Sequence, residues 1–387
     1  MKISFLAIQK GLILIFLMIF LAWIVRTPLP IPDRVGSIDF RAYWSASYLF
    51  TRGMDFGDPQ ALDNVERSLT GWDGAFTMQA WFTPTGHLFL SPLTFLPFPQ
   101  AARVWLLFNI FLLTLSAWLL ADSDESPPWL PISVTFCFSA TLTSIFFGQI
   151  NTLSVAGLAL YLYFRRQQKD VLAGFSLILI LIKPHLVSLT LLPLLLSLIW
   201  HKRWRVLLGA GLSGVAVLLA LFLIHRGWLL SFWKVAQSGL GSARLAPSLA
   251  GLLVYLGYPY AGQWLWCIGL LLVLGGWWLF KDIEERRLFD LTLPFGLALN
   301  PYGWSYDQII LLLPLLSLVR WIAASPPGRV KWGFAICLIG LNLLSYLQRL
   351  VVQNDVWFFW IPLMVFGMYL AGVPEELQSR KDRINGS

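Results

Sequence analysis

The chain has 387 residues, of which 57% are hydrophobic and only 12% carry a charge. Soluble domains average about 25% charged residues, so this composition excludes an ordinary soluble protein. Apolar runs of about 18 residues or more recur along the sequence, and in hydrocarbon such runs must be helical to satisfy their backbone N–H and C=O groups. The sequence therefore predicts an all-α polytopic membrane protein.

The net charge of +8 does not indicate nucleic-acid binding. Lys and Arg occur in short clusters between apolar runs, where they set the orientation of the chain in the membrane. Cys137, Cys267 and Cys337 lie within apolar runs, without a CxxC pattern or a nearby histidine. We expect them to be buried small hydrophobic residues, with neither a disulfide framework nor a metal site.

The first apolar run, residues 6–25, is too long for the core of a signal peptide and no small-residue cleavage site follows it. It predicts a retained anchor with a cytoplasmic N-terminus. The longest polar stretch follows and contains seven carboxylates: Asp33, Asp39, Asp55, Asp58, Asp63, Glu66 and Asp73. Five aromatic residues there recur at helical spacing: Phe40, Tyr43, Trp44, Tyr48 and Phe50. This spacing predicts a helix with one apolar face that lies in the membrane interface.

Residues 87–98 are interrupted by prolines, so they predict a re-entrant hairpin. Residues 171–200 are too long for one straight crossing, and we expect two short helices that meet at Lys183-Pro184-His185. Single crossings are predicted at 101–120, 130–147, 152–164, 206–224, 263–280, 288–299, 309–323, 332–346 and 356–370. The prediction is about twelve crossings in one domain, residues 1–373, with a large extracytoplasmic loop at 26–100 and a polar, poorly ordered cytoplasmic tail at 374–387.

The basic loops at 165–169, 201–205, 281–287 and 329–331 fall on the cytoplasmic side if the crossings alternate from a cytoplasmic N-terminus. The same alternation places a set of polar and aromatic residues together on the outer face: Asp39, Gln149, Asn151, Lys183, His185, Asn300, Trp304, Tyr306 and Asp307. This shared position predicts a functional site.

Lys183 stands between two apolar stretches, where a cation costs several kcal/mol unless a partner or water offsets it. It is either part of a site or a residue that extends its ammonium to the headgroups and caps a short helix. Pro184 breaks the helix and frees backbone groups near Lys183 and His185, which suits an anion such as phosphate. For His185 alone, a satisfied polar contact within the bundle is the stronger interpretation.

Residues 300–307, Asn-Pro-Tyr-Gly-Trp-Ser-Tyr-Asp, combine aromatic faces with polar groups between two apolar runs. The combination suits a sugar, but an interfacial turn with Trp304 and Tyr306 in the aromatic belt would have the same composition. Gly148-Gln-Ile-Asn151 is a weaker indication of chemistry, because its glycine also allows close helix packing.

Asp39 is the candidate for proton transfer. A carboxylate near hydrocarbon has its pKa raised by desolvation, which suits a general base that accepts a proton from an attacking hydroxyl. The alternative is an N-cap for the helix that begins at Phe40. The residues alone leave both interpretations open.

Several short motifs follow one another in order, and together they resemble glycosyltransferase family 87 over about residues 35–325. They are Asp-Phe-x-x-Tyr-Trp at 39–44, Thr83-Pro84 with Ser91-Pro-Leu93 and Leu96-Pro97, Ala101-x-x-Val-Trp105, Gly148-Gln-Ile-Asn151, Ala173-Gly174 leading to Ile182-Lys-Pro184, and Asn300-Pro-Tyr-Gly-Trp304. Because each motif is short, specificity comes from their order and spacing.

The resemblance implies a GT-C-fold enzyme that uses a polyprenyl-phosphate-linked sugar, as bacterial mannosyltransferases of lipid glycan synthesis do. We then expect an inverting transfer of mannose or a similar hexose or pentose, independent of metal and cofactor. The acceptor would be a hydroxyl of a glycolipid, glycan or protein. The active site would lie on the extracytoplasmic face of the bacterial cell (inner) membrane.

The resemblance also implies residue roles. Asp39 matches the aspartate that serves the family as base, and Lys183 would lie near the donor phosphate. The family commonly has a histidine after the Pro-x-x-Trp element, where this chain has Tyr306-Asp307. His185 or Arg244 would then supply the phosphate contact. Sugar or acceptor binding is expected of Tyr43, Gln149, Asn151, Asn300, Trp304, Tyr306 and Asp307.

Two other classes of protein fit part of the pattern. Transporters and lipid flippases also build sites from broken helices, but they usually show corresponding breaks in two halves and a site near the midplane. This sequence has no internal repeat, and its motifs gather on one side. A scaffold without catalytic activity in a glycan assembly complex would leave Asp39 replaceable.

Overall fold

The computed structural model describes residues 35–75, 77–121, 129–240, 245–324 and 328–385. Every regular element in these ranges is a helix, so the all-α prediction is confirmed there. The predicted first span at 6–25 and Arg244 lie outside the described residues.

Six helices within the described ranges are long and apolar enough to cross a membrane, and two bent pairs raise the number to eight. The six are α5 (Phe98–Leu120), α11 (Trp204–Ile224), α14 (Ala261–Leu279), η3 with α16 (Ser305–Leu311 and Leu312–Ala324), α17 (Arg329–Val351) and η4 with α18 (Asp355–Phe358 and Trp360–Asn385). This supports a polytopic membrane protein, while twelve crossings remain a prediction. Because α18 continues to Asn385, the predicted tail is helical to that residue.

The second bent pair confirms the break predicted at Lys183-Pro184. Helix α9 (Asp170–Ile180) ends before it, and the segment formed by η2 (Pro184–Val187) and α10 (Ser188–Trp200) is bent by 119° relative to α9. Proline removes a backbone donor and disfavours helical conformation in the residue before it, which explains the position of the bend. Lys183 therefore stands at the apex of a re-entrant turn.

The first bent pair corrects a prediction. Residues 130–147 were expected to form one span, but α6 (Trp129–Cys137) and α7 (Ser139–Phe147) meet at 68°. Phe138 between them is extended, with ψ 126°, and its side chain is fully buried. Burial of this ring in the core accompanies the interruption between the two helices.

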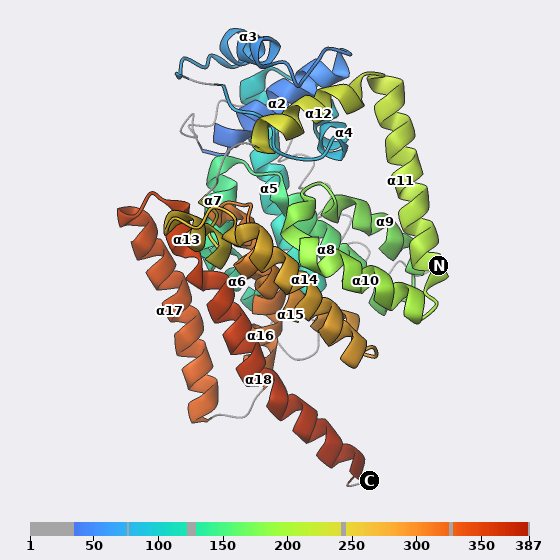
Figure 1. Ribbon diagram of the computed structural model, residues 1–387, viewed down its shortest axis with the longest axis vertical. Helices are drawn as coiled ribbons and strands as arrows, with labels where there is room; N and C mark the ends of the chain where they lie inside the picture. The colour runs from blue at the N-terminus through green and yellow to red at the C-terminus, as the bar shows by residue number, and fades with distance from the viewer. Residues whose placement is uncertain (1–34, 76, 122–128, 241–244, 325–327, 386–387) are drawn as a thin grey trace, which may run out of the picture.

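Five helical segments gather at one end of the molecule and form what we call the cap (Figure 1): α2 (Ile38–Thr51), α3 (Pro59–Thr70), α4 (Thr85–Leu90), η1 (Ser91–Phe95) and α12 (Trp228–Leu240). Helix α3 begins where the Asp58 side chain accepts a hydrogen bond from Gln60 N, with proline in the first turn, and ends at Gly71 in the left-handed conformation. These are common start and stop signals of helices.

Helix α2 forms where the aromatic spacing predicted it, but it is not buried on its apolar face alone, and its place in the membrane interface stays a prediction. Its polar residues are buried as well as its aromatic ones, with Ser45 and Ser47 fully enclosed. Phe40 stacks on Trp105 of α5 at 5.4 Å between ring centroids, and Trp44 donates a hydrogen bond to Leu93 O of η1 at 3.0 Å. Helix α2 is therefore the core of the cap.

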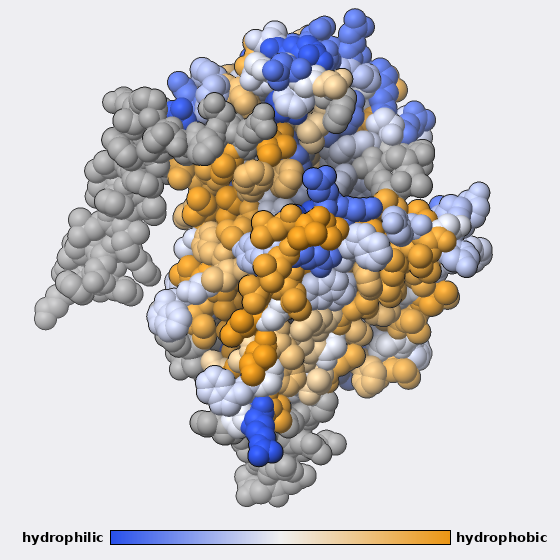
Figure 2. Space-filling model, turned by 90° about the vertical axis from the view of Figure 1, so that its left-hand side faces the viewer, coloured by the Kyte–Doolittle hydropathy of each residue, from blue (hydrophilic) through white to orange (hydrophobic). Residues whose placement is uncertain are grey.

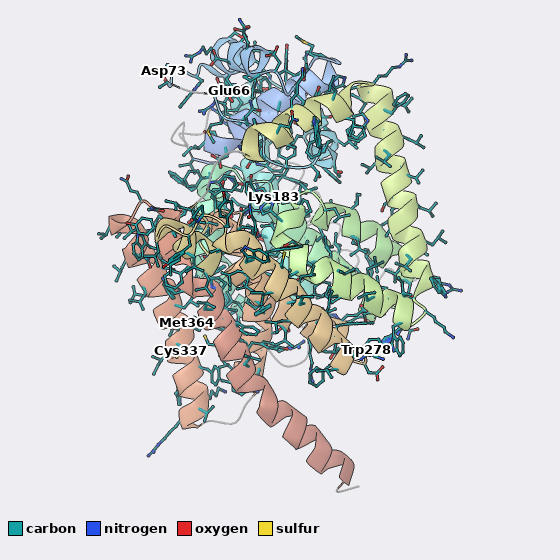
Figure 3. The ribbon with its side chains drawn as sticks, in the orientation of Figure 1. Glu66, Asp73, Lys183, Trp278, Cys337 and Met364 are labelled. Carbon is teal, nitrogen blue, oxygen red and sulfur yellow. The ribbon has the colours of Figure 1, made fainter. Side chains whose placement is uncertain are left out.

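Glu66 of α3 is one of the seven carboxylates in the polar stretch that follows the first apolar run, and it is not solvated. It is fully buried and pairs with Arg41 of α2, with 3.1 Å between Oε2 and Nε. Burial raises the pKa of Glu66 to about 7, against the opposing effect of Arg41. Figure 3 labels Glu66 and Asp73 in the cap, above the long helices.

Below the cap, the surface carries a broad apolar band (Figure 2). Exposed apolar residues also occur on the candidate spans around the molecule, among them Leu223 of α11, Leu271 of α14 and Leu350 of α17. An apolar surface of this kind faces lipid in a membrane protein. The three cysteines are exposed rather than buried as predicted, and Cys267 and Cys337 lie on α14 and α17. They are small apolar residues on the outside of the bundle.

Candidate active site

A close backbone contact places Asp39 over the end of α7. Gly148 ends α7 in the left-handed conformation, with φ +72°, and a Cβ atom built there would lie 2.2 Å from Gly36 O. The Gly36 N–H donates to Phe146 O at 2.7 Å, and Trp105 Nε1 donates to Gly148 O at 2.8 Å. The close packing expected of this glycine is confirmed, and it brings the first turn of α2 against Gln149.

Gln149 is fully buried and its amide has one defined orientation. Its Oε1 accepts hydrogen bonds from the Tyr43 hydroxyl at 2.8 Å and from Lys183 Nζ at 2.9 Å. Because both donors meet the carbonyl oxygen, the amide nitrogen is directed to the other side, where it donates to Asp39 Oδ2. Gln149 thus connects the predicted base to the predicted cation.

Lys183 is 1% exposed, so the interpretation in which it extends to the headgroups is wrong. Its Nζ donates to Asp307 Oδ1 at 3.0 Å and lies 5.2 Å from the centre of the Tyr306 ring. Asp307 Oδ2 accepts a hydrogen bond from Trp304 N at 3.1 Å and lies 3.4 Å from His185 Nε2. Figure 3 shows Lys183 between the cap and the long helices.

Asn151 and Asn300 connect the segments around Lys183 through hydrogen bonds to backbone carbonyl groups. Asn151 Nδ2 donates to Tyr306 O at 2.9 Å, and Asn300 Nδ2 donates to His185 O at 2.7 Å. These bonds connect the start of α8 (Asn151–Arg166) with η3, and the end of α15 (Glu285–Leu299) with η2. Neither asparagine lines the cavity described next, and His185 does not line it either.

A cavity of about 680 Å³ opens beside Asp39. Five of the predicted site residues line it: Asp39, Tyr43, Lys183, Trp304 and Tyr306. The rings of Trp304 and Tyr306 stack with 5.8 Å between their centroids. Sites for small ligands typically have volumes of about 300–1,000 Å³, so the space is large enough for a sugar and a phosphate.

Two charged residues that line the cavity, Arg349 and Asp355, were not predicted from the sequence. Arg349 stands in the last turn of α17, and its Nη2 donates to Asp355 Oδ1 at 2.9 Å and to Ser305 Oγ. Ser305 N and Oγ each donate to Asp355 at 3.0 Å. A signal was present, because the polar break at 352–355 lies between two apolar runs, as the break at 300–307 does.

Asp39 has the electrostatics of a general base. Burial raises the pKa of its carboxyl from 3.8 to about 6, while Lys183 and a hydrogen bond with Tyr306 act in the opposite direction. It stands in the first turn of α2 without an N-cap role, since Ser37 occupies the cap position, so the N-cap interpretation is wrong. A carboxylate with this pKa is ionised at neutral pH and can accept a proton from a hydroxyl in the cavity.

The described residues contain no group of three or more His, Cys, Asp or Glu side chains that could hold a metal ion. Independence from metal and cofactor remains a prediction.

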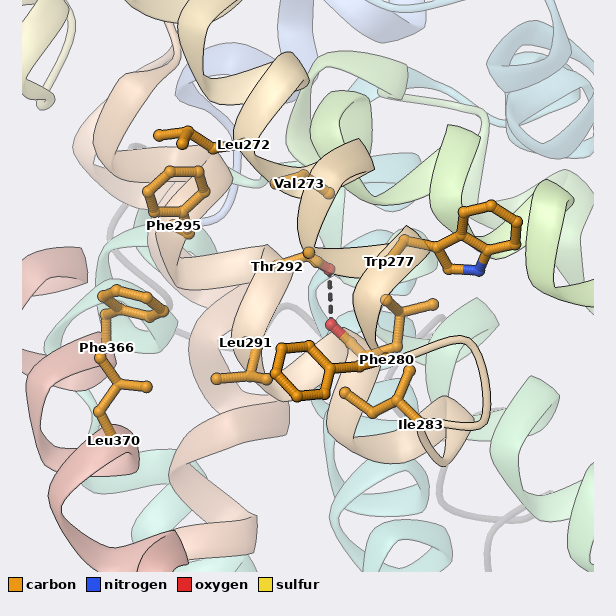
Figure 4. A pocket seen from close by; sticks show the side chains of 12 residues that line it. Leu272, Val273, Trp277, Phe280, Ile283, Leu291, Thr292, Phe295, Phe366 and Leu370 are labelled. Atoms are coloured by element: carbon orange, nitrogen blue, oxygen red, sulfur yellow. Dashed lines mark hydrogen bonds between the residues drawn. The ribbon is translucent and has the colours of Figure 1, made fainter.

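A second cavity, of about 340 Å³, lies between α14, α15 and α18 (Figure 4). Its lining is almost entirely apolar, with Leu272, Phe295 and Phe366 among its residues. The Thr292 hydroxyl donates to Leu288 O at 2.7 Å. None of the described lining residues is an acid, a base or a cation, so this cavity offers no group for proton transfer or for binding a phosphate.

A comparison with protein families matches residues 81–301 to glycosyltransferase family 87. The matched range covers more than half of the chain and includes Gln149, Lys183 and Asn300. No curated protein and no solved structure was found to match. The chain therefore belongs to glycosyltransferase family 87 and is a membrane glycosyltransferase.

Proposed function

We propose that this protein transfers a sugar, mannose or a similar hexose or pentose, from a polyprenyl phosphate to an acceptor hydroxyl, with Asp39 as general base. The observation that carries the proposal is the position of Asp39. Its carboxyl lines a cavity of about 680 Å³ together with a buried cation, Lys183, and two stacked aromatic rings.

In the proposed reaction the acceptor oxygen attacks the anomeric carbon of the sugar. Its proton passes to Asp39 while the bond between the anomeric carbon and the phosphate oxygen breaks. The electron pair of that bond leaves with the polyprenyl phosphate, and a single displacement inverts the anomeric configuration. Positive charge near the leaving oxygen stabilises the transition state, and Lys183 contributes to this field.

The proposed acceptor is a hydroxyl of a glycolipid, glycan or protein. The faces of Trp304 and Tyr306 suit the apolar side of a pyranose ring, and Tyr43 lines the cavity next to Asp39. Gln149 and Asp307 act on the substrate through the residues that they position, since their hydrogen bonds run to Asp39 and Lys183.

We place the cavity on the extracytoplasmic face of the cell membrane. The basic loops around Arg165, Arg203 and Arg286 line one cavity together. Helix α11 runs from this region to the cap (Figure 1). Because basic loops stay on the cytoplasmic side, the cap and the site below it belong on the other side.

The test uses purified protein in lipid vesicles with radiolabelled polyprenyl-phosphate sugars and candidate acceptors. Transfer by the wild type, and its loss in Asp39→Asn, support the proposal. If no such donor is consumed, the transporter, flippase or scaffold interpretation replaces it.

The sidedness has its own test. Asp73→Cys, an exposed position in the cap, should react with an impermeant thiol reagent added from outside cells. The unsubstituted protein, with its three native cysteines, is the control. Labelling only from the cytoplasmic side would overturn the placement.

A further inference from the structure

We propose that Arg349 binds the phosphate of the lipid-linked sugar donor, in the corner of the cavity that it forms with Ser305 and Asp355. This inference rests on the proposed function, because it assigns the donor phosphate a place within the same cavity. Arg349 lies 44 residues after Ser305 in the sequence and on a different helix.

The Arg349 guanidinium is held in one orientation. Its Nη2 is bonded to Asp355 and Ser305, and its central carbon lies 4.0 Å from the centre of the Phe358 ring. Among the described residues, Nε and Nη1 have no hydrogen-bond partner, and the side chain is 32% exposed. The Nε–H and the N–H groups of Nη1 can each donate to a phosphate oxygen, whereas a parallel pair of donors would need Nη2, which is already bonded to Asp355 and Ser305.

The other cation of the described lining is less suited to this role. Lys183 is 1% exposed, two of its three N–H donors are used by Gln149 and Asp307, and the Asp307 carboxylate offsets its charge at 3.0 Å. His185 faces Asp307 and does not line the cavity. Arg349 is therefore the accessible cation of the described lining, while Lys183 holds Gln149 and Asp307 in place.

The position of Arg349 also fits an isoprenoid substrate. It stands where α17 reaches the cavity, and the neighbouring side chains of that helix are apolar and exposed, with Leu347 at 50% and Leu350 at 83%. Figure 2 shows the apolar band on the side of the molecule that carries α17. A polyprenyl chain along α17 would remain in hydrocarbon while its phosphate reaches Arg349 and its sugar points to Asp39.

Asp355 offsets part of the charge of Arg349, so binding would depend on the oriented N–H groups more than on net charge. Charge-assisted hydrogen bonds contribute about 1.5–3 kcal/mol. We therefore expect Arg349→Gln to raise the KM for the donor by about 10- to 100-fold. The KM for the acceptor should stay within about twofold. Arg349→Lys keeps the charge but loses the oriented guanidinium N–H groups, so its donor KM should lie between those of the wild type and Arg349→Gln.

A binding measurement separates this inference from catalysis. Polyprenyl phosphate without a sugar should bind to the wild-type protein and quench its tryptophan fluorescence, and Arg349→Gln should weaken that binding by a similar factor. Arg329→Gln, at the other end of α17 and exposed, is the matched control and should bind as the wild type does. Melting temperatures in detergent establish that the variants fold, and Arg349→Lys carries the test if the glutamine variant does not.

Three outcomes would overturn the inference. One is an unchanged donor KM and unchanged polyprenyl phosphate binding in both Arg349 variants. Another is a rise in the acceptor KM alone, which would assign the corner to a phosphate of the acceptor. The third is equal weakening in Arg329→Gln, which would indicate non-specific attraction. Failure of the wild type to use any polyprenyl-phosphate sugar would instead refute the proposed function, and the binding measurement would still decide the role of Arg349.

Discussion

Lys183→Met should be one of the most destabilising single substitutions in this protein. Lys183 and Asp307 are both almost fully buried, and their charged atoms are 3.0 Å apart. Removal of one partner leaves the other charge in the interior, which typically costs about 3–5 kcal/mol. In the variant, Asp307 still has the Trp304 N–H and His185 beside it. Because these groups partly stabilise its charge, the loss in free energy of unfolding should stay within this range.

Unfolding of the purified protein in detergent, monitored by circular dichroism during a denaturant titration, measures the effect. The double variant Lys183→Met, Asp307→Asn removes both charges and should recover more than half of the lost free energy of unfolding. Lys234→Met is the control, because Lys234 and Asp55 form an ion pair that is 46% and 33% exposed. Exposed pairs are screened by water and contribute little to stability. Equal destabilisation by Lys183→Met and Lys234→Met would refute the reasoning.

Two further substitutions test the geometry around Asp39. Gln149→Met removes the hydrogen bond donated to Asp39, so kcat should fall about tenfold or more. The carboxylate also loses a donor that favours its charged form, which raises its pKa. The acidic limb of the pH–rate profile should therefore move to higher pH. An unchanged profile would show that Gln149 does not act through Asp39. Gly148→Ala places a Cβ at φ +72° against Gly36 O and should lower the free energy of unfolding by at least about 1–3 kcal/mol. Gly53→Ala, at φ +67° with open space around it, is the matched control and should cost less.

The sequence predicted those features of the site that depend on local chemistry. Proline at 184 predicted the break that places Lys183 at an apex, and the aromatic spacing predicted α2. The polar breaks around 149 and 300–307 indicated which segments meet. Local patterns of this kind are readable because backbone geometry and hydrophobic periodicity act over a few residues.

Features that depend on distant partners were missed. Glu66 reads as a solvated carboxylate until Arg41, 25 residues away, is placed beside it. The aromatic face of α2 indicated burial on one side, but only the packing of α3 and α4 shows that the polar side is buried too, with Arg41 against Glu66 and Ser47 against His87. Arg349 looked like an ordinary residue at a helix end, because its contacts with Ser305 and Asp355 exist only in the folded chain.

The most direct test of the central claim is the rate of sugar transfer from a polyprenyl-phosphate donor, measured for the wild type and Asp39→Asn over a range of pH. Because the pKa of Asp39 is raised to about 6, the wild-type kcat/KM should rise with pH up to about 6 and then level off. Loss of a general base typically costs about 10²- to 10⁴-fold, so the Asn variant should be at least about 100-fold slower and lack this limb. Transfer by Asp39→Asn at the wild-type rate would contradict the account.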